Sequence, residues 1–441
     1  MTQRLLRYDE ALARLLQGAV ALTGTERIAT QEARGRVLAR AVVSALDVPP
    51  LDNTSMDGYA VRRADVPAPG ARLRVTQRIP AGAVGHALEP GCAARIFTGA
   101  PVPPGADAVV MQELCAHDGE FVTVNHAPHD GEWIRRRGED IAAGQPVLAA
   151  GVRLGPAQLG MAASVGAARL EVFRRLRVAL FSTGDELAMP GEPLRPGGIY
   201  NSNRYTLRGL LEALGCAVSD MGIVPDRREA TRAVLREAAA ANDLILTSGG
   251  VSVGEEDHVK PAVEAEGELA LWNVAIKPGK PLAFGHVRRP ADGLEVSPGG
   301  DDGCPADGQE LSPGDDDGRP ADGLKVSPGG TVPFIGLPGN PVSSFVTFLM
   351  LVRPFIIEAQ GGRYVPPRGL RLRADFAWKG DRRREFLRVR LNDEGGLDLF
   401  PNQSSGVLTS CAWADGLVDN PADQPIAAGD SVRFLPFSEL L

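Results

Sequence analysis

The feature that most restricts the fold is an alternation of short apolar runs and amphipathic helical segments between Arg177 and Ile357. Each apolar run is too short for a buried helix and is bounded by turn residues, which is typical of a buried strand. Strands that alternate with helices form a mostly parallel sheet, because each helix returns the chain to the start of the next strand. The sequence therefore predicts an α/β domain with a mostly parallel sheet.

The strands predicted for this domain are 178–182, 217–224, 244–247, 271–276, 282–287 and 332–337. The predicted helices are 202–214, 227–241 and 342–358, and the last of these is apolar on most sides and expected to be buried. Asp226 and Glu229 match a capping box at the start of the second helix. Asn340 and Pro341 match an N-cap and a first helical residue for the third.

The strand at 244–247 runs into a glycine-rich loop that ends on the acids Glu255, Glu256 and Asp257. Glycines let backbone N–H groups approach a ligand closely, because positive φ costs them little. A helix starting after such a loop would favour a phosphate, and the acids would place oxygen ligands for Mg²⁺ beside it. The alternative is a tight turn followed by a solvated acidic helix start.

Acidic residues also follow two other predicted strands, as Asp185 with Glu186 and as Asp226. Ligands of open α/β sheets bind at the carboxyl ends of the strands. We therefore expect a shared metal and phosphate site at this edge rather than three unrelated helix caps. Lys277 and Lys280 also lie beside a predicted strand and would supply positive charge.

Composition excludes several classes of partner. A chain of 441 residues is expected to hold roughly three domains. A net charge of −8 without a basic block argues against nucleic acid or an anionic membrane as the main partner. The five cysteines are scattered, which indicates a reducing compartment. The N-terminus is typical of an amphipathic helix rather than a signal peptide, and 346–352 is too short to span a membrane, so we expect a cytoplasmic protein.

Four domains are predicted in all. An N-terminal mixed domain comprises 1–46 and 143–176, with helices at 8–17 and, running into a strand, at 31–45. A small β domain, 47–142, is inserted between these segments. The α/β domain spans 177–362, and a C-terminal β-barrel-like domain spans 363–441.

Several polar residues of the β domains have ordinary structural explanations. Asp57 lies in a turn, where Asx hydrogen bonds are the commoner role. Cys115, His117, His126 and His129 do not have the spacing of a zinc site, and a surface hairpin is expected there. The basic run 382–384 either binds an anion or forms a solvated edge strand, and composition slightly favours the strand.

The α/β region is interrupted by an internal repeat whose copies begin at Arg289, Cys304 and Arg319, a spacing of 15 residues. The repeat is rich in Pro, Gly and Asp and poor in large apolar residues, so it cannot bury a core. We expect 288–330 to be a disordered insertion without a catalytic role.

Eight motifs together resemble those of the molybdopterin molybdenumtransferase family, whose members insert molybdate into adenylylated molybdopterin. In order they are PPLDNTSMDGYAVR, IFTGAPVPPGADAVVMQE, RRRGEDI, STGDEL, IVPD, TSGGVSVGEEDHVK, IKPGKPLAFG and GLPGNPVSSFVTF. The resemblance covers nearly the whole chain. The smaller adenylylating enzymes of the same pathway share the core domain but lack the inserted and C-terminal β domains.

The resemblance implies a set of site residues drawn from three domains. The implied catalytic residues are Asp57, Thr98, Asp140, Glu186, Asp226 and Asp257. The implied substrate-binding residues are Ser248, Gly249, Gly250, Lys277, Lys280, Pro338, Asn340, Pro341, Arg383 and Ser405. Because 382–384 contains three arginines, the match at Arg383 allows a register shift.

The resemblance also implies a cofactor and partners. Mg²⁺ is expected on Glu186 and Asp257, with adenylyl-molybdopterin and molybdate as substrates. A homodimer is expected, in which the inserted domain of one subunit faces the core domain of the other, as is contact with the adenylylating enzyme. Two alternative functions remain open, a molybdopterin-binding scaffold and a molybdopterin adenylyltransferase.

Overall fold

The structure is a computed structural model that describes residues 5–251, 258–290 and 330–441. The chain divides into two compact units. The first comprises 1–26, 35–39 and 172–441, and the second comprises 27–34 and 40–171. Asp257 and nearly all of the repeat lie outside the described residues.

A six-stranded sheet organises the first unit and confirms the mostly parallel α/β architecture. Its strand order is β16 (Ala217–Val224), β13 (Arg177–Thr183), β17 (Leu244–Ser248), β21 (Thr331–Leu337), β20 (Pro281–Arg288) and β18 (Gly267–Asn273). The first four strands are parallel, and β20 runs antiparallel to both of its neighbours. The prediction at 271–276 was wrong in its limits, because β18 begins at Gly267 and ends at Asn273.

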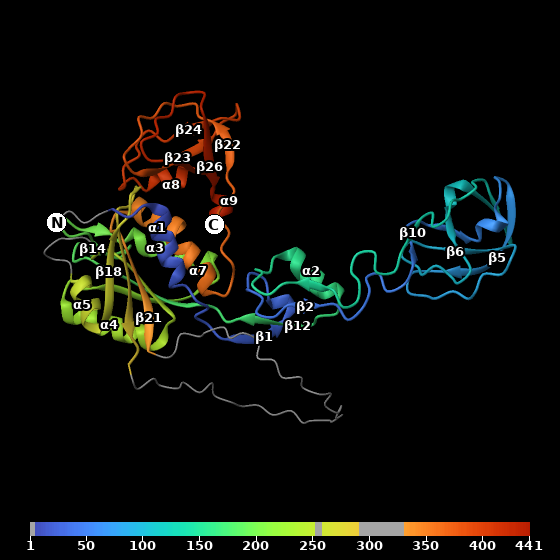
Figure 1. Cartoon of the computed structure of the whole chain (residues 1–441), viewed down its shortest axis with the longest axis horizontal. Coiled ribbons are helices and arrows are strands. Elements are labelled where there is room, and N and C mark those ends of the chain that lie inside the picture. Colours follow the sequence, from blue (N-terminus) through green and yellow to red (C-terminus); the bar gives the residue numbers. More distant parts are fainter. Residues whose placement is uncertain (1–4, 252–257, 291–329) are drawn as a thin grey trace. The chain divides into compact units, whose positions relative to one another are not determined.

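Helices cover both faces of this sheet (Figure 1). One face packs against α1 (Tyr8–Gln17), α3 (Ser202–Ala213), α6 (Pro341–Thr347) and α7 (Arg353–Ala359), with a π-helical turn at Phe348–Val352 between the last two. The other face packs against α4 (Arg228–Ala241) and α5 (Val259–Glu266). The stretch Pro341–Ala359 is long and apolar enough to cross a membrane, but 83% of its most apolar window is buried, so it is the core helix that was predicted.

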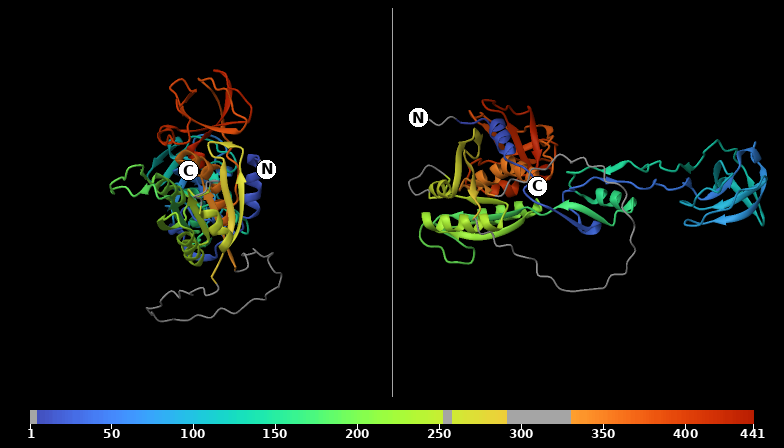
Figure 2. Two further views of the ribbon diagram at one scale, coloured as in Figure 1. Left: turned by 90° about the vertical axis from the view of Figure 1, so that its left-hand side faces the viewer. Right: turned by 60° about the horizontal axis from the view of Figure 1, so that its bottom comes forward.

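A second sheet of the first unit joins the C-terminal segment to the α/β region. Its order is β19 (Ile276–Lys277), β23 (Arg384–Leu391), β25 (Gly416–Asn420), β26 (Ser431–Pro436) and β22 (Leu370–Arg373), and β24 (Leu397–Leu399) also pairs with β23. The β19–β23 ladder sets Lys277 opposite Glu385. Figure 2 shows the red C-terminal strands beside the helices of this unit. The edge-strand prediction for 382–384 was wrong, because β23 starts at Arg384 and has strands on both sides.

The second unit contains the predicted inserted β domain. Its sheet has the order β7 (Ala108–Met111), β4 (Gly58–Val61), β6 (Cys92–Ile96), β5 (Ala71–Ile79), β9 (Phe121–Val124) and β8 (Cys115–Asp118). Apolar residues are buried on both faces of the sheet. Strands β8 and β9 form the predicted hairpin, and α2 (Pro156–Ser164) follows the β domain.

Shorter elements complete the chain. They are β1 (Thr25–Ala29), β2 (Val42–Val43), β3 (Asn53–Thr54), β10 (Ile134–Arg135), β11 (Pro146–Leu148), β12 (Arg169–Phe173), β14 (Leu187–Ala188), β15 (Ile199–Tyr200), α8 (Thr409–Trp413), α9 (Phe437–Leu440) and the 3₁₀ turns Thr30–Glu32, Arg63–Asp65 and Gln112–Leu114.

The helix predicted at 31–45 is not formed. The chain makes only the 3₁₀ turn Thr30–Glu32 and then the short strand β2. Gly35 has φ +75°, a left-handed conformation that ends any helix at this point. The four-domain division stays a prediction, although the apolar face of α1 (Tyr8, Ala11 and Leu15) packs within the first unit.

Candidate active site

A polar cavity of about 720 Å³ lies at the carboxyl edge of the parallel strands in the first unit. Loops after β13, β16, β17 and β21 line it, together with loops of the C-terminal domain. Ten of the implied site residues line this cavity, four of them on the glycine and proline loops. The lining positions that the sequence singled out are Glu186, Asp226, Gly249, Gly250, Lys277, Lys280, Pro338, Asn340, Arg383 and Ser405.

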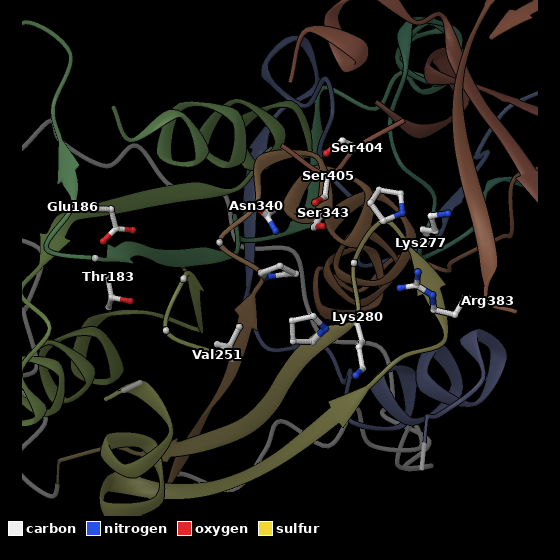
Figure 3. A pocket seen from close by; sticks show the side chains of 18 of the residues that line it. Thr183, Glu186, Val251, Lys277, Lys280, Asn340, Ser343, Arg383, Ser404 and Ser405 are labelled. Atoms are coloured by element: carbon white, nitrogen blue, oxygen red, sulfur yellow. The ribbon is translucent and has the colours of Figure 1, made fainter. Parts of the chain in front are cut away.

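Charges of opposite sign occupy opposite sides of the cavity. Figure 3 shows Glu186 beside Thr183 on one side, and Lys277, Lys280 and Arg383 on the other. The arrangement follows from the topology, because Glu186 comes after β13 whereas the lysines flank the β19–β20 connection. The cavity can therefore bind a ligand that carries an anionic group at one end and a cation-bridged group at the other.

The acidic side is built from two neighbouring strand ends. The backbone N–H of Asp185 donates to Oδ2 of Asp226 (3.3 Å), and the N–H of Asp226 donates to Oδ1 of Asp185 (3.2 Å). Burial raises the pKa of Asp226 above its usual value, and the negative charges of Asp185 and Glu186 raise it further. Three carboxylates are thus gathered where their mutual repulsion favours a cation or a proton.

Asp226 does not cap α4, so the capping-box prediction was wrong. The N-cap of α4 is Arg227, which makes no side-chain cap hydrogen bond. The Asp226 carboxylate instead accepts from the loop after β13. Local sequence could not distinguish these outcomes, because Asp226 is next to the cap position in the chain and its deciding partner, Asp185, lies in the loop after another strand, β13.

The glycine loop is held against the end of β13. Gly249 and Gly250 have φ of +90° and +64°, and a β-carbon on them would lie 2.7 Å from the Thr183 carbonyl oxygen and 2.4 Å from Cγ2 of Val259 respectively. Only glycine fits both positions. The N–H of Gly249 donates to the carbonyl of Leu337 (3.1 Å), so this donor is not free for a phosphate.

Ser248, which the resemblance implies as a substrate-binding residue, is not among the residues that line the cavity. Its side chain is buried and lies 3.3 Å from the hydroxyl of Ser182. Pro341 is the first residue of α6 and does not line the cavity either. Asn340 is the N-cap of α6, as predicted, but its side chain makes no capping hydrogen bond and stays at the cavity wall.

Lys277 is held by two carboxylates that sequence reasoning missed. Its Nζ lies 3.1 Å from both Asp381 Oδ2 and Glu385 Oε1, and it lies over the ring of Trp378. Burial alone would lower the pKa of Lys277, but the hydrogen bonds to Glu385 and Asp381 raise it above its usual value. Lys277 is therefore a fixed positive charge, positioned by the C-terminal domain.

Arg383 is the arginine of the basic run that faces the cavity. Its Nε donates to Oδ1 of Asp381 (3.1 Å), and this hydrogen bond is the main reason that the pKa of Asp381 is lowered. Arg384 instead pairs with Asp419. Lys280 makes no ion pair with any residue in the described ranges, so its exposed ammonium remains available to an anion.

The buried residue Arg388 shapes the last wall of the cavity, formed by Gln403, Ser404 and Ser405. Arg388 is 1% exposed, and its Nη2 donates to the Ser404 carbonyl (3.3 Å). Gln403 bonds both the N–H and the C=O of Arg388 (3.0 Å each), and the Ser405 carbonyl accepts from Val342 N (3.0 Å). Burial lowers the pKa of Arg388 to about 10. No local motif marks this arginine, since its role depends on a loop fifteen residues away.

Three implied residues, Asp57, Thr98 and Asp140, lie in the second unit. Thr98 donates to Asp57 Oδ1 from both its backbone N–H (2.8 Å) and its hydroxyl (2.7 Å). These bonds, the backbone one first, lower the pKa of the partly exposed Asp57. Asp140 is exposed, and its N–H donates to the carbonyl of Val48 (3.0 Å).

The acidic side fits a magnesium ion only when substrate completes its coordination. Mg²⁺ is commonly held by one or two carboxylates together with phosphates of the substrate. Glu186 and Asp226 supply such oxygens in the cavity wall. Within the described parts of the chain, no group of three or more His, Cys, Asp or Glu side chains forms a complete metal site.

A polar cavity at the carboxyl edge of a parallel sheet, with carboxylates facing cations, defines an α/β protein that binds a phosphate-bearing ligand. Comparison with protein families narrows this class. The chain matches the MoeA N-terminal region (domain I and II) over residues 6–166, the probable molybdopterin binding domain over 179–358, and the MoeA C-terminal region (domain IV) over 371–437. The chain belongs to the MoeA family, which confirms the resemblance found in its sequence motifs.

Individual relatives match over the full length. The molybdopterin molybdenumtransferase of Haemophilus influenzae is 35% identical, and the match covers 99% of this chain and 100% of the relative. Molybdopterin molybdenumtransferase 2 of Mycobacterium tuberculosis is 37% identical over 91% of this chain and 92% of the relative. The crystal structure of the molybdopterin biosynthesis MoeA protein from Pyrococcus horikoshii is similar with a TM-score of 0.75 and 26% identity, covering 98% and 100% of the two chains.

Proposed function

We propose that this chain inserts molybdate into adenylyl-molybdopterin with release of AMP. The observation that carries the proposal is that Glu186 lies across one cavity from Lys277, Lys280 and Arg383 (Figure 3), with the Asp226 carboxylate close enough to feel the charge of Glu186. This separation of charges suits two ligands. One is a substrate whose pyrophosphate is neutralised by a cation, and the other is a free oxyanion. The full-length match to the relatives supports the same activity.

The cationic side binds the oxyanions in this proposal. Lys280 and Arg383 contact molybdate or the pterin-side phosphate of the pyrophosphate, because both line the cavity and Lys280 has no ion pair of its own among the described residues. Lys277 stays charged between Asp381 and Glu385 and contributes a fixed positive potential. Fixed charges stabilise the developing negative charge of the leaving phosphate without reorganising.

The acidic side holds Mg²⁺ in this proposal, through Glu186 with Asp226 or Asp257. The ion, when bound, neutralises the pyrophosphate and makes AMP a better leaving group. Asp226 already lies against Asp185, so its position is fixed before substrate arrives. Asp57 and Asp140 are the candidates for moving the protons that exchange of oxo groups requires.

The finer features of the assembly are also proposals. We propose a cytoplasmic homodimer in which Asp57, Thr98 and Asp140 of one subunit complete the site of the other, and which contacts the adenylylating enzyme. This would explain why the implied residues fall into two compact units. Sedimentation velocity of the purified chain tests the dimer, since a monomer at micromolar concentration would contradict it.

The activity is tested by incubating the purified chain with adenylyl-molybdopterin, Mg²⁺ and molybdate, and measuring AMP by chromatography. AMP release that requires molybdate supports the proposal. Glu186→Ala should lower the release rate by about two orders of magnitude or more, because it removes a charge that acts on the transition state. Glu237→Ala on the exposed face of α4 is the matched control.

Two results would contradict the proposal. Absence of AMP release by folded protein would favour a binding scaffold, and consumption of ATP with free molybdopterin would favour adenylyl transfer. Wild-type turnover by Glu186→Ala would refute the assignment of that residue even if the activity itself were present.

A further inference from the structure

A second cavity, of about 530 Å³, opens in the β domain of the second unit. We call it the β-domain pocket, and its lining includes Tyr59, Arg78, Arg95, Gln112 and His117. Strand register explains why these residues meet. Tyr59 on β4 pairs with Arg95 on β6, and Arg95 pairs with Arg78 on β5, so the three side chains form one row across the sheet.

The two arginines of this row converge on one aromatic ring. The guanidinium carbons of Arg78 and Arg95 lie 4.5 Å and 4.7 Å from the centre of Phe97. Neither guanidinium forms an ion pair with a carboxylate anywhere in the described ranges of the chain. Two positive charges held at one ring repel each other, and an anion between them would relieve that repulsion.

Arg95 is pre-oriented for such an anion. Its guanidinium donates to the carbonyl of Gly58 (3.1 Å) and to Oε1 of Gln112, and it lies 5.1 Å from the centre of Tyr59. These contacts fix the plane of the guanidinium but neutralise none of its charge. An arginine held in this way loses little conformational entropy when it binds an oxyanion.

The surroundings add hydrogen-bonding groups, and the two nearby carboxylates are not among the residues that line the pocket. His117 stacks on Tyr59, with ring centres 6.4 Å apart and planes at 19°. Burial raises the pKa of Cys115 to about 11, so its thiol is neutral at physiological pH. The nearby acids are Glu113 and Asp57, and Oδ1 of Asp57 is already bonded twice by Thr98.

We propose that the β-domain pocket binds a tetrahedral oxyanion of the phosphate or molybdate type between Arg78 and Arg95. Guanidinium groups match such anions geometrically and bind them through charge-assisted hydrogen bonds. The ligand is either a free oxyanion or the phosphate of a larger molecule, for which the volume leaves room. The site lies wholly in the second unit and does not depend on the proposed reaction.

The test measures oxyanion binding by equilibrium dialysis in a full-length Arg383→Ala background, which weakens binding at the α/β cavity. Molybdate and inorganic phosphate are used as separate probes, so that preference for either identifies the source of the anion. Arg78→Met keeps the apolar stem over Phe97 and removes the charge. It should weaken binding about tenfold, the usual contribution of a charge-assisted hydrogen bond.

Two further variants make the result specific. Arg78→Lys keeps the charge and should retain most of the affinity. Arg72→Met is the matched control, because Arg72 lies on the same strand with its guanidinium 4.4 Å from the ring centre of Phe121, but outside the pocket. The affinity of Arg72→Met for the oxyanion should equal that of the background chain. Cooperative thermal unfolding of each variant shows that it is folded.

Three outcomes would each overturn the proposal. In the first, neither probe shows saturable binding to the background chain, and in the second, Arg78→Met leaves the affinity unchanged. In the third outcome, Arg78→Met and Arg72→Met lower the affinity for the oxyanion equally. The last result would show that only the overall positive charge of the domain attracts the anion.

Discussion

At the scale of single residues, the cavity of the first unit shows that the role of a side chain depends on the residues packed around it. Asp226 looks like a helix cap in the sequence, but in the structure it faces Asp185 and Glu186. Lys277 looks like a free cation, but it is fixed by Asp381 and Glu385. In both cases the deciding group is distant in sequence and close in space.

The unfavourable electrostatic environment of the Asp226 carboxylate leads to a prediction about stability. Its raised pKa means that the charged carboxylate is disfavoured in the folded chain, so ionisation of Asp226 lowers stability at neutral pH. This cost is absent below about pH 3.8, the ordinary pKa, where the group is protonated both folded and unfolded. Asp226→Asn should therefore raise the melting temperature at pH 7 in EDTA by about 1–3 °C and lower AMP release.

Calorimetry at pH 7 and at acid pH checks this prediction. The gain should shrink as the pH falls toward the ordinary pKa of the carboxyl. Asp393→Asn, on an exposed turn, removes the same charge without the cluster and serves as control. A melting temperature of Asp226→Asn at or below that of the wild type at pH 7 would contradict the account.

At the scale of elements, each wall of the cavity comes from a loop whose conformation is set by a neighbouring segment. The glycine loop is set by its packing on Thr183 and Val259. The 403–405 loop is set by Arg388 on β23 and by Val342 of α6. The buried guanidinium has no carboxylate partner among the described residues, so its hydrogen bonds to the Ser410 hydroxyl and to the carbonyls of Phe386 and Ser404 offset its desolvation cost.

Arg388 therefore acts as a positioning residue, and Arg388→Met should raise the KM for adenylyl-molybdopterin about tenfold with a smaller change in kcat. The change leaves the Ser404 carbonyl without its donor, so the loop should also be cleaved faster in limited proteolysis. Because Met fills similar space, the fold should be retained.

The matched control for this prediction is Arg390→Met, two residues along the same strand. Arg390 is exposed and lies over the ring of Trp413 (4.6 Å), away from the cavity. Steady-state kinetics should show wild-type KM for Arg390→Met. A wild-type KM in folded Arg388→Met would exclude the positioning role.

At the scale of the whole molecule, the repeat is joined to β20 and β21 at the strand ends that face away from the cavity. The insertion leaves β20 at Arg288 and re-enters β21 at Thr331, and these two residues pair. The cavity lies at the opposite ends of the same strands, near Pro281 and Pro338. The N–H of Arg289 donates to the carbonyl of Gly330 (2.7 Å), so the two ends of the insertion are already side by side.

Replacing residues 290–329 with Asn-Gly should consequently leave the enzyme intact. Asn-Gly favours the turn that joins two antiparallel strands in this register. Removing a long loop lowers the entropy of the unfolded chain, so kcat/KM should stay within about twofold and the melting temperature should not fall. AMP release and calorimetry measure both quantities. A loss of activity in a folded variant would show that the repeat has a catalytic role.

The sequence by itself determined most strands and helices of the α/β region, because apolar spacing and turn residues act locally, although it placed β18 wrongly and did not delimit α5. It also determined that the acids and lysines lie at the carboxyl edge of the sheet, because this position follows from the direction of the strands. Only the tertiary structure decided that Asp226 turns toward Asp185, that β19 carries Lys277 into the C-terminal sheet, and that Arg78 and Arg95 share one ring. These contacts depend on which strands pair and in which register, and that is settled by packing between segments far apart in the chain.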